Sequence, residues 1–288
     1  MLEYLGVIGY PLKRSLSPVF QQAALDHLRL DIVYEAWPTP EDGLETRMKT
    51  LRSPTVLGAN VTIPHKEAVV SMLDDVDEVA GRIGAVNTIV NRAGKLFGYN
   101  TDVSGLMRTL RDDGAFEPEG KRVVVAGAGG AARAAVAGLL EAGAASVTVI
   151  NRTFGRALSV VEDFRRGGSK TPVGAMPDDY RSWEFAMRHS DLLINCTPVA
   201  SADSIQSPLP LELIEKRHFV FDLIYDPTET SLVAAGKRAG AKVLGGLPML
   251  VYQGAASFEL WTGQEAPIEI MFEAARSALE AGAAKGRT

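Results

Sequence analysis

The sequence predicts an α/β protein with two domains, each built around a largely parallel β-sheet. Three observations support this prediction. The chain has 288 residues, whereas a single domain typically has about 100 to 200. Short apolar runs alternate with helical patterns along the chain, which is typical of βαβ units. A glycine-rich turn at residues 127–132 follows an apolar run and begins a second series of such units.

The first part of the chain alternates strands with helices. The runs LGVIGY, IVYEAW and VLGANVTI predict strands, and residues 18–30 and 43–51 predict helices between them. Pro18 suits a first helical turn, because proline lacks the N–H that would be unpaired there. Pro64 predicts in the same way a helix that carries Lys66 near its first turn. The runs AVNTIVNR and KLFGYN flank Ala93-Gly94 and predict a hairpin.

The second part predicts a doubly wound sheet. A helical pattern over residues 102–113 leads into the turn GAFEPEGK. From Val123 we expect a strand, the glycine-rich turn, a helix (131–142), the strand SVTVIN, a helix (154–165), a polar loop, the strands DLLINC and FVFDLIY, a helix and the strand AKVLGG. We therefore expect domains at residues 1–101 and 102–247, separated by a cleft, with helices over 248–261 and 267–284 returning to the first domain.

Composition excludes several classes of protein. The net charge of −5 argues against a nucleic-acid partner, which requires concentrated lysine and arginine. The chain contains no run of about 18 apolar residues, so we expect no membrane span. Cys196 is the only cysteine, which excludes internal disulfides and fits a reducing compartment. No metal is expected, because the histidines lack the spacing of metal ligands: His27, His65, His189 and His218.

The amino-terminal residues also bear on location. Glu3 precedes the basic pair Lys13 and Arg14, which is the opposite of the charge order in a signal peptide. We therefore expect a cytoplasmic protein.

The glycine-rich turn GAGGAA predicts a dinucleotide site. It lies between an apolar strand and a helix, which is the context that gives this pattern its meaning. Gly127 permits a tight turn, and Gly129 lets the backbone approach a pyrophosphate at the positive end of the helix. Ala132 replaces the third glycine and still allows close packing of the helix on the strand. The loop residues predicted to contact the cofactor are Gly127, Ala128, Gly129, Gly130 and Ala131.

The end of the next strand indicates which dinucleotide is bound. NAD-dependent enzymes place a carboxylate there on the ribose 2′-hydroxyl, but this chain has Asn151. Arg152 offers a planar cation for a 2′-phosphate, Thr153 offers a hydroxyl, and Arg156 adds a second charge. The sequence therefore predicts NADP as the cofactor.

Polar residues in the first domain predict a substrate site. Asn60, Thr62 and Lys66 surround a junction between a strand and a helix, and the VNT and NTD motifs add Asn87 and Asp102. Amides, hydroxyls and one lysine suit a polyhydroxylated ring that bears a carboxylate. Reduction of a ketone by a nicotinamide requires a proton donor beside the carbonyl oxygen. Lys66 and Asp102 are the candidate pair.

Together these motifs resemble those of the shikimate dehydrogenase family along nearly the whole chain. In that resemblance SLS implies Ser15 and Ser17 on the substrate carboxylate, and NVTIPHK implies Thr62 as a substrate contact and Lys66 as the catalytic acid/base. The other implied roles are Asn87 on the substrate, Asp102 as the partner of Lys66, Gln253 of MLVYQ on a ring hydroxyl, Tyr225 of FDLIYDP near the substrate, Leu223 near the nicotinamide, and Thr197 and Gly246 as cofactor contacts.

The chain departs from the family in one segment. After LLINCTP the family usually continues with a Gly-Met or similar pair, whereas this chain reads VASADSIQSPLP. We expect Cys196 and the segment from Val199 to Ser207 to alter the loop over the nicotinamide.

The resemblance implies an NADPH-dependent reduction of 3-dehydroshikimate to shikimate on the route to chorismate and the aromatic amino acids. A mixed quinate/shikimate dehydrogenase and a non-catalytic NADP-binding regulator stay open as alternatives. Ser15, Ser17 and Arg152 favour shikimate and NADP, and the presence of Lys66 and Asp102 favours an enzyme. A folate-type methylene dehydrogenase leaves SLS and NTD unexplained. We expect a monomer or a homodimer.

Overall fold

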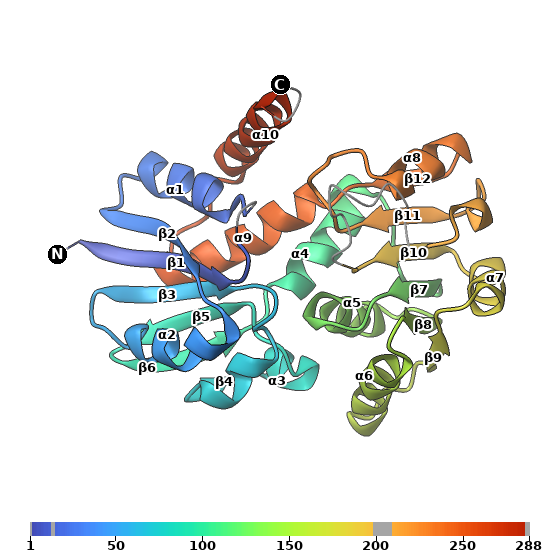
Figure 1. Cartoon of the computed structure of the whole chain (residues 1–288), viewed down its shortest axis with the longest axis horizontal. Helices are drawn as coiled ribbons and strands as arrows, with labels where there is room; N and C mark the ends of the chain where they lie inside the picture. Colours follow the sequence, from blue (N-terminus) through green and yellow to red (C-terminus); the bar gives the residue numbers. More distant parts are fainter. Residues whose placement is uncertain (1, 13–14, 198–208, 286–288) are drawn as a thin grey trace. The chain divides into compact units, whose positions relative to one another are not determined.

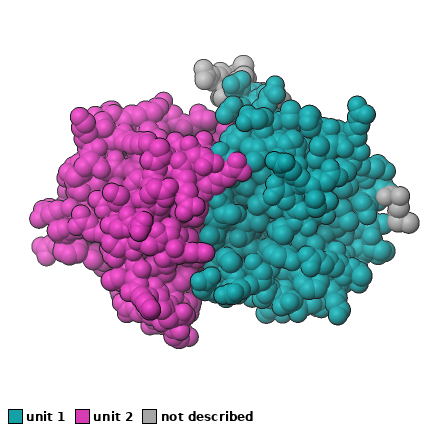
Figure 2. Space-filling model, turned by 180° about the vertical axis from the view of Figure 1, so that it is seen from behind, with its two compact units in different colours: residues 1–105, 251–288 teal, residues 106–250 magenta. Residues whose placement is uncertain are grey.

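The computed structural model describes residues 2–12, 15–197 and 209–285. The chain divides into two compact units. Unit 1 contains Met1–Gly105 and Val251–Thr288, and unit 2 contains Leu106–Leu250 (Figure 2). The segment from Val199 to Ser207 lies outside the described residues. In the described part of the chain no helix is long and apolar enough to cross a membrane.

Unit 1 is built on a mixed sheet in the order β2-β1-β3-β5-β6-β4. β1 pairs in parallel with β2 and β3, and β4 pairs in parallel with β6. β5 is antiparallel to both neighbours, and the predicted hairpin at Ala93-Gly94 is confirmed. The strands are β1 (Glu3–Gly9), β2 (Ile32–Pro38), β3 (Val56–Val61), β4 (Asp75–Val76), β5 (Thr88–Arg92) and β6 (Lys95–Tyr99).

Helices cover the sheet of unit 1 on both faces (Figure 1). On one face Met48 and Leu51 join a buried cluster with Ile8 and Val61 of the sheet. On the other, the indole N–H of Trp261 donates to the Ile89 carbonyl at 2.9 Å. The helical elements are α1 (Ser17–His27), η1 (Glu41–Gly43), α2 (Leu44–Thr50), η2 (Ala68–Met72), α3 (Glu78–Ile83), the start of α4 (Asp102–Arg108), most of α9 (Leu247–Thr262) and α10 (Ile268–Lys285), which packs on α1.

The prediction that Lys66 lies on a helix is wrong. Lys66 lies in a turn after β3, and only a short 3-10 helix, η2, follows from Ala68. The Lys66 carbonyl accepts the Val86 N–H at 2.8 Å. Because this carbonyl pairs with a residue just before β5, it is not available for an α-helical bond, which explains why the helix does not begin at Pro64.

Unit 2 contains a doubly wound parallel sheet, as predicted, and its strand order is β12-β11-β10-β7-β8-β9. The strand order reverses at β7 and β10, and ligands of such sheets bind at the carboxyl ends of the strands at that point. The elements are η3 (Thr109–Asp113), β7 (Arg122–Ala126), α5 (Gly130–Glu141), β8 (Ser146–Asn151), α6 (Phe154–Arg166), β9 (Val173–Pro177), α7 (Tyr180–Arg188), β10 (Leu192–Asn195), η4 (Leu211–Leu213), β11 (Phe219–Asp222), α8 (Ser231–Arg238) and β12 (Lys242–Leu244).

The prediction of a polar loop before the DLLINC strand is wrong. That stretch contains the edge strand β9 and the helix α7. Asp179 caps α7 by accepting the Ser182 N–H at 2.8 Å. Trp183, Ala186 and Met187 are buried and lie on one face of the helix, so packing against the sheet stabilises this segment.

Candidate functional site

Lys66 and Asp102 form an ion pair in unit 1. The Lys66 Nζ lies 2.5 Å from Asp102 Oδ2, and the two side chains are 16% and 5% exposed. Asp102 is the first residue of α4, and Lys66 follows the carboxyl end of β3. The pair is therefore a shielded lysine–carboxylate couple in which Lys66 keeps some access to solvent.

Asn87 fixes the other oxygen of Asp102. Its Nδ2 donates to Asp102 Oδ1 at 2.8 Å and lies 3.2 Å from Gln253 Oε1. Asn87 is 1% exposed and immediately precedes β5, while Gln253 belongs to α9. Four residues that the sequence assigned to the site are therefore brought together from four different segments.

A buried network of hydroxyls and amides continues from this group. Thr88 Oγ1 lies 3.0 Å from Asn87 Oδ1 and 2.7 Å from Ser257 Oγ. Asn60 Nδ2 donates to Ser257 Oγ at 3.0 Å, and the Tyr34 hydroxyl donates to Asn60 Oδ1 at 2.7 Å. Tyr34, Thr88, Thr101 and Ser257 were not among the site residues predicted from the sequence. Thr88 and Thr101 had a signal, since they belong to the VNT and NTD motifs.

Ser17 joins the far end of the network. It is the first residue of α1, is 7% exposed, and hydrogen-bonds the Tyr34 side chain. Burial raises the pKa of Tyr34 well above its ordinary value, and the Ser17 hydrogen bond acts in the opposite direction. Tyr34 therefore stays a neutral hydroxyl donor.

Ser15 and Thr62 lie in the loops that follow neighbouring strands. Ser15 stands in the loop between β1 and α1, where its N–H donates to the Leu12 carbonyl at 3.2 Å. The Thr62 N–H donates to the Ile8 carbonyl at 2.8 Å. A Cβ built on Gly9 would come within 2.4 Å of the Thr62 methyl, so the two loops begin in close contact.

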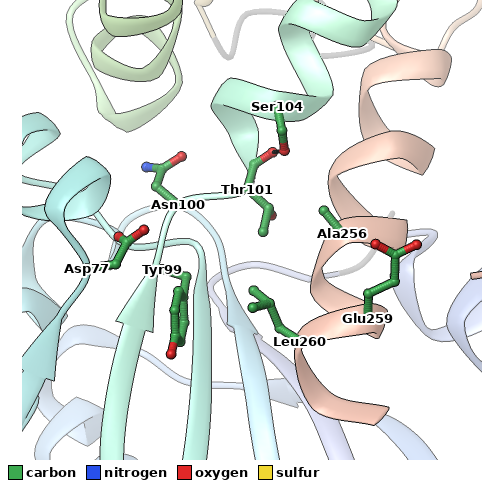
Figure 3. A pocket seen from close by; sticks show the side chains of 8 residues that line it. All are labelled: Asp77, Tyr99, Asn100, Thr101, Ser104, Ala256, Glu259 and Leu260. Atoms are coloured by element: carbon green, nitrogen blue, oxygen red, sulfur yellow. Dashed lines mark hydrogen bonds between the residues drawn. The ribbon is translucent and has the colours of Figure 1, made fainter. Parts of the chain in front are cut away.

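A pocket of about 360 Å³ opens beside the start of α4 (Figure 3). Asn100, Thr101 and Ser104 form one wall, and Ser104 Oγ donates to the Thr101 carbonyl at 3.0 Å. Glu259 and Leu260 of α9 form the other wall. Lys66 and Asp102 do not line this pocket, although Thr101, which does, immediately precedes Asp102. The pocket is therefore distinct from the site of the ion pair.

The glycine-rich loop of unit 2 has the geometry that a pyrophosphate requires. Gly127 has φ +109°, and a Cβ there would lie 3.2 Å from the Cys196 carbonyl carbon and oxygen. A Cβ on Gly129 would meet nothing within 4 Å, so the backbone at the amino end of α5 is open to a ligand. Ala128 completes this loop, Gly130 and Ala131 are the first residues of α5, and these residues fit a dinucleotide.

The predicted selectivity residues lie together at the end of β8. Asn151 Nδ2 donates to the Thr153 carbonyl at 2.9 Å and closes the turn. Arg152, Thr153 and Arg156 are exposed. Two guanidinium groups and a hydroxyl therefore lie at the surface at the end of β8, with an amide and not a carboxylate at Asn151.

The remaining assigned residues follow β10, β11 and β12. Asn195 Oδ1 accepts from the backbone N–H of Thr197 at 3.1 Å and from its hydroxyl at 2.6 Å. Asp222 accepts from Asn195 Nδ2 at 2.9 Å, and burial raises the pKa of its carboxyl group. A Cβ on Gly246 would lie 2.0 Å from the Leu223 carbonyl oxygen, which requires glycine there.

Tyr225 lies in unit 2, whereas the other assigned substrate residues lie in unit 1. Burial raises the pKa of Tyr225, with a smaller contribution from Asp226. Among the residues that the structure describes, no three His, Cys, Asp or Glu side chains form a metal-binding group.

Models of one family match three parts of the chain. "Shikimate dehydrogenase substrate binding domain" matches residues 7–89, "Shikimate / quinate 5-dehydrogenase" matches residues 113–222, and "Shikimate 5'-dehydrogenase C-terminal domain" matches residues 246–276. The shikimate dehydrogenase (NADP(+)) of Moorella thermoacetica is 42% identical over 290 residues, which cover 98% of this chain and 96% of that protein.

Solved structures agree with these matches. The shikimate 5-dehydrogenase of Thermus thermophilus, in complex with NADP(H) and shikimate, is 42% identical with a TM-score of 0.85 and covers 96% of this chain and 100% of its own. A quinate dehydrogenase from Corynebacterium glutamicum, in complex with NAD, is 29% identical with a TM-score of 0.87, covering 96% and 99% of the two chains. The chain therefore belongs to the shikimate dehydrogenase family.

Proposed function

We propose that this chain is an NADP-dependent oxidoreductase that interconverts 3-dehydroshikimate and shikimate, a step towards chorismate and the aromatic amino acids. The observation that carries the proposal is the Lys66–Asp102 ion pair, held by Asn87 and joined by Gln253, in a chain 42% identical to a shikimate dehydrogenase (NADP(+)). A bare NADP-binding regulator has no need of such a shielded acid–base pair.

Unit 2 holds the cofactor in this proposal. NADPH, when bound, supplies the hydride for reduction of the ketone. The open backbone at Gly129 and the start of α5 accept the pyrophosphate, and Arg152 holds the 2′-phosphate. The full set of proposed cofactor contacts is Gly127, Ala128, Gly129, Gly130, Ala131, Asn151, Arg152, Thr153, Arg156, Thr197, Leu223 and Gly246.

Unit 1 holds the substrate. Ser15 and Ser17 bind the carboxylate with their hydroxyl groups, and Thr62, Asn87 and Gln253 bind the ring hydroxyls. Tyr225 is the proposed substrate contact from unit 2. The mixture of donors and acceptors matches a ring with several hydroxyl groups, each of which both donates and accepts.

Lys66 and Asp102 move the proton. Negative charge develops on the carbonyl oxygen as the ketone is reduced, and the Lys66 Nζ delivers a proton to that oxygen. Asp102 holds the ammonium in place through its Oδ2, 2.5 Å away. In the direction of oxidation the same pair takes the proton from the shikimate hydroxyl.

Each proposed domain role is assigned to a defined part of the chain. Residues 1–101 form the substrate domain together with the helices from about residue 248 to 288, and residues 102–247 form the NADP-binding domain. In the structure, the chain passes from unit 1 to unit 2 between Gly105 and Leu106, and returns to unit 1 between Leu250 and Val251. A cytoplasmic location, which rests on the single cysteine, and a monomeric or homodimeric state also belong to the proposal.

The experiment is an initial-rate panel with the purified protein. Shikimate and quinate are each oxidised with NADP and with NAD, and Lys66→Ala is measured beside the wild type. We expect activity with shikimate and NADP that falls by roughly 10²- to 10⁴-fold in the variant, which is the usual contribution of a general acid/base. Strong turnover of quinate or NAD would instead favour a mixed quinate/shikimate dehydrogenase. This alternative is supported by the similarity of the chain to a quinate dehydrogenase solved in complex with NAD. NADP binding without turnover of either substrate would favour the regulator.

A further inference from the structure

We propose that Ser257 is a positioning residue whose buried hydroxyl orients the Asn87 amide and, through it, the Asp102 carboxylate. The inference rests on the proposed function, because it assigns a role relative to the Lys66–Asp102 pair. Ser257 itself contacts neither residue of that pair. It lies on α9, far along the chain from Asn60 of β3, Thr88 of β5 and Thr101, which precedes α4.

Ser257 is fully buried and its hydroxyl has four polar neighbours. Its Oγ donates to the Gln253 carbonyl at 2.9 Å, one helical turn earlier. Asn60 Nδ2 donates to it at 3.0 Å. The hydroxyl oxygens of Thr88 and Thr101 lie 2.7 and 3.1 Å away. A serine hydroxyl provides one donor and two acceptor sites, so these neighbours use its full capacity.

This arrangement sets the direction of the hydrogen bonds around Asn87. Because the Ser257 proton is on the Gln253 carbonyl, Ser257 accepts from Asn60 and from one threonine hydroxyl. The other threonine then donates to Asn87 Oδ1, which lies 3.0 Å from Thr88 Oγ1 and 3.2 Å from Thr101 Oγ1. The Thr101 backbone N–H donates to the same oxygen at 2.8 Å.

The oriented Asn87 amide has one consequence for catalysis. With Oδ1 held by donors, Nδ2 must face its acceptors, which are Asp102 Oδ1 at 2.8 Å, Thr101 Oγ1 at 2.9 Å and Gln253 Oε1 at 3.2 Å. Removing the Ser257 hydroxyl takes the shortest contact from Asn60 Nδ2, which keeps the Asn87 carbonyl at 3.2 Å and Thr88 Oγ1 at 3.3 Å. It also removes a partner of the Thr88 and Thr101 hydroxyls, which can then turn away from Asn87 Oδ1. The carboxylate then loses a fixed orientation towards Lys66, and small misplacements of catalytic groups cost up to about 100-fold in rate.

The test compares Ser257→Ala with Ser190→Ala, measured on the full chain. Ser190 is also buried, and its Oγ donates to the Met187 carbonyl at 3.2 Å, but it belongs to unit 2. We expect Ser257→Ala to lower kcat for shikimate at least about tenfold, with KM for NADP within about twofold of wild type. Ser190→Ala should keep kcat within about twofold at a comparable change in Tm.

Two further measurements keep the inference falsifiable. Thr88→Val preserves the shape of the side chain and removes the hydroxyl between Ser257 and Asn87, so it decides the matter if Ser257→Ala does not fold. A kcat within about twofold of wild type in the folded variant would overturn the inference, as would equal losses in the two serine variants. In nuclear magnetic resonance spectra the Asn87 side-chain amide should shift in Ser257→Ala and not in Ser190→Ala. This readout needs no turnover, so it still tests the positioning role if wild-type protein fails to oxidise shikimate and the proposed function falls.

Discussion

The two oxygens of the Asp102 carboxylate have different partners. Asp102 can therefore pair with Lys66 through one oxygen while the other oxygen fixes its own orientation. Oδ2 faces the Lys66 ammonium and Oδ1 accepts from Asn87. A carboxylate held at both oxygens cannot rotate freely, and charge-assisted hydrogen bonds are stronger than neutral ones. Asp102 therefore presents Lys66 in a fixed position instead of following its movements.

Arg152 carries the first prediction at this scale. Arg152→Gln should raise KM for NADP by about 10- to 100-fold, because hydrogen bonds to a charged group contribute about 1.5–3 kcal/mol and about 1.4 kcal/mol is tenfold in affinity. KM for NAD, which lacks the 2′-phosphate, should change by less than about twofold. Steady-state kinetics with each cofactor provide the measurement.

The matched control is Arg188→Gln, since Arg188 is also an arginine of unit 2 and pairs with Glu184 at 3.1 Å on α7. It should leave both KM values near wild type. If Arg152→Gln raised both KM values equally, Arg152 would contribute to dinucleotide binding in general and not to the choice of NADP.

Most residues of the ion-pair site were predictable, because each lies in a short motif. Lys66, Asn87 and Asp102 stand in NVTIPHK, GAVNT and NTD, and the structure joins them directly. Tyr34 and Ser257 were not predictable. Ser257 meets Asn60 from 197 positions away in the chain, and no local pattern marks a serine on an apolar helix as the centre of a network.

The junction between α7 and β11 depends on a buried histidine. His218 Nδ1 accepts the Glu215 N–H at 2.9 Å, and Nε2 lies 3.0 Å from the Met187 carbonyl at the end of α7. The neutral ring with its proton on Nε2 satisfies both contacts. A second proton on Nδ1 would face the Glu215 N–H. Burial lowers the pKa of His218, and Arg217 adds to this effect.

This pKa direction predicts how stability depends on pH. An unfolded histidine titrates near about 6.5, whereas the folded chain favours the neutral ring. The stability from His218 is therefore fully present above that value and is lost as pH falls through the lower, folded pKa. Urea unfolding at several pH values should show the wild-type free energy of unfolding falling below about pH 6.5, with a smaller slope in His218→Gln.

The variant should also be less stable at neutral pH, by about 1–3 kcal/mol, because the Glu215 N–H and the buried Met187 carbonyl lose their hydrogen bonds to the ring. His27→Gln is the control, since His27 is exposed at the end of α1. It should follow the wild-type pH slope. An identical slope in wild type and His218→Gln would contradict a neutral, structural His218.

At the scale of elements, periodicity predicted long amphipathic segments well and short ones poorly. The doubly wound architecture of unit 2 and the hairpin of unit 1 followed from apolar runs and turn residues. The pair β9 and α7 was missed because Val173 alone is buried in β9 and much of α7 is polar. The Asp179 cap and the spacing of Trp183, Ala186 and Met187 were the available signal.

At the scale of the whole molecule, the proposed function divides the two ligands between the two units. The proposed cofactor contacts all lie in unit 2, and the proposed substrate contacts lie in unit 1 with the exception of Tyr225. Unit 1 is itself made from both ends of the chain, since α9 and α10 return to it from residue 251 onward. Gln253 and Ser257 reach the Asn87 network only by this return, so the order of the motifs along the chain does not indicate which of them meet.

Hydrogen–deuterium exchange with single ligands tests this separation. A ligand that binds the native state stabilises it by about 2.7 kcal/mol at a hundredfold excess over Kd, and local opening reports that gain where the ligand binds. NADP alone should slow amide exchange around residues 123–133 and 150–156, and shikimate alone around residues 60–66, 87–102 and 251–257. Lys66→Ala with NADP is the control, because the proposed cofactor contacts do not include Lys66 and the protection pattern should be unchanged. Slower exchange at 60–66 with NADP alone, to the same extent as with shikimate, would show that the two sites are not divided in this way.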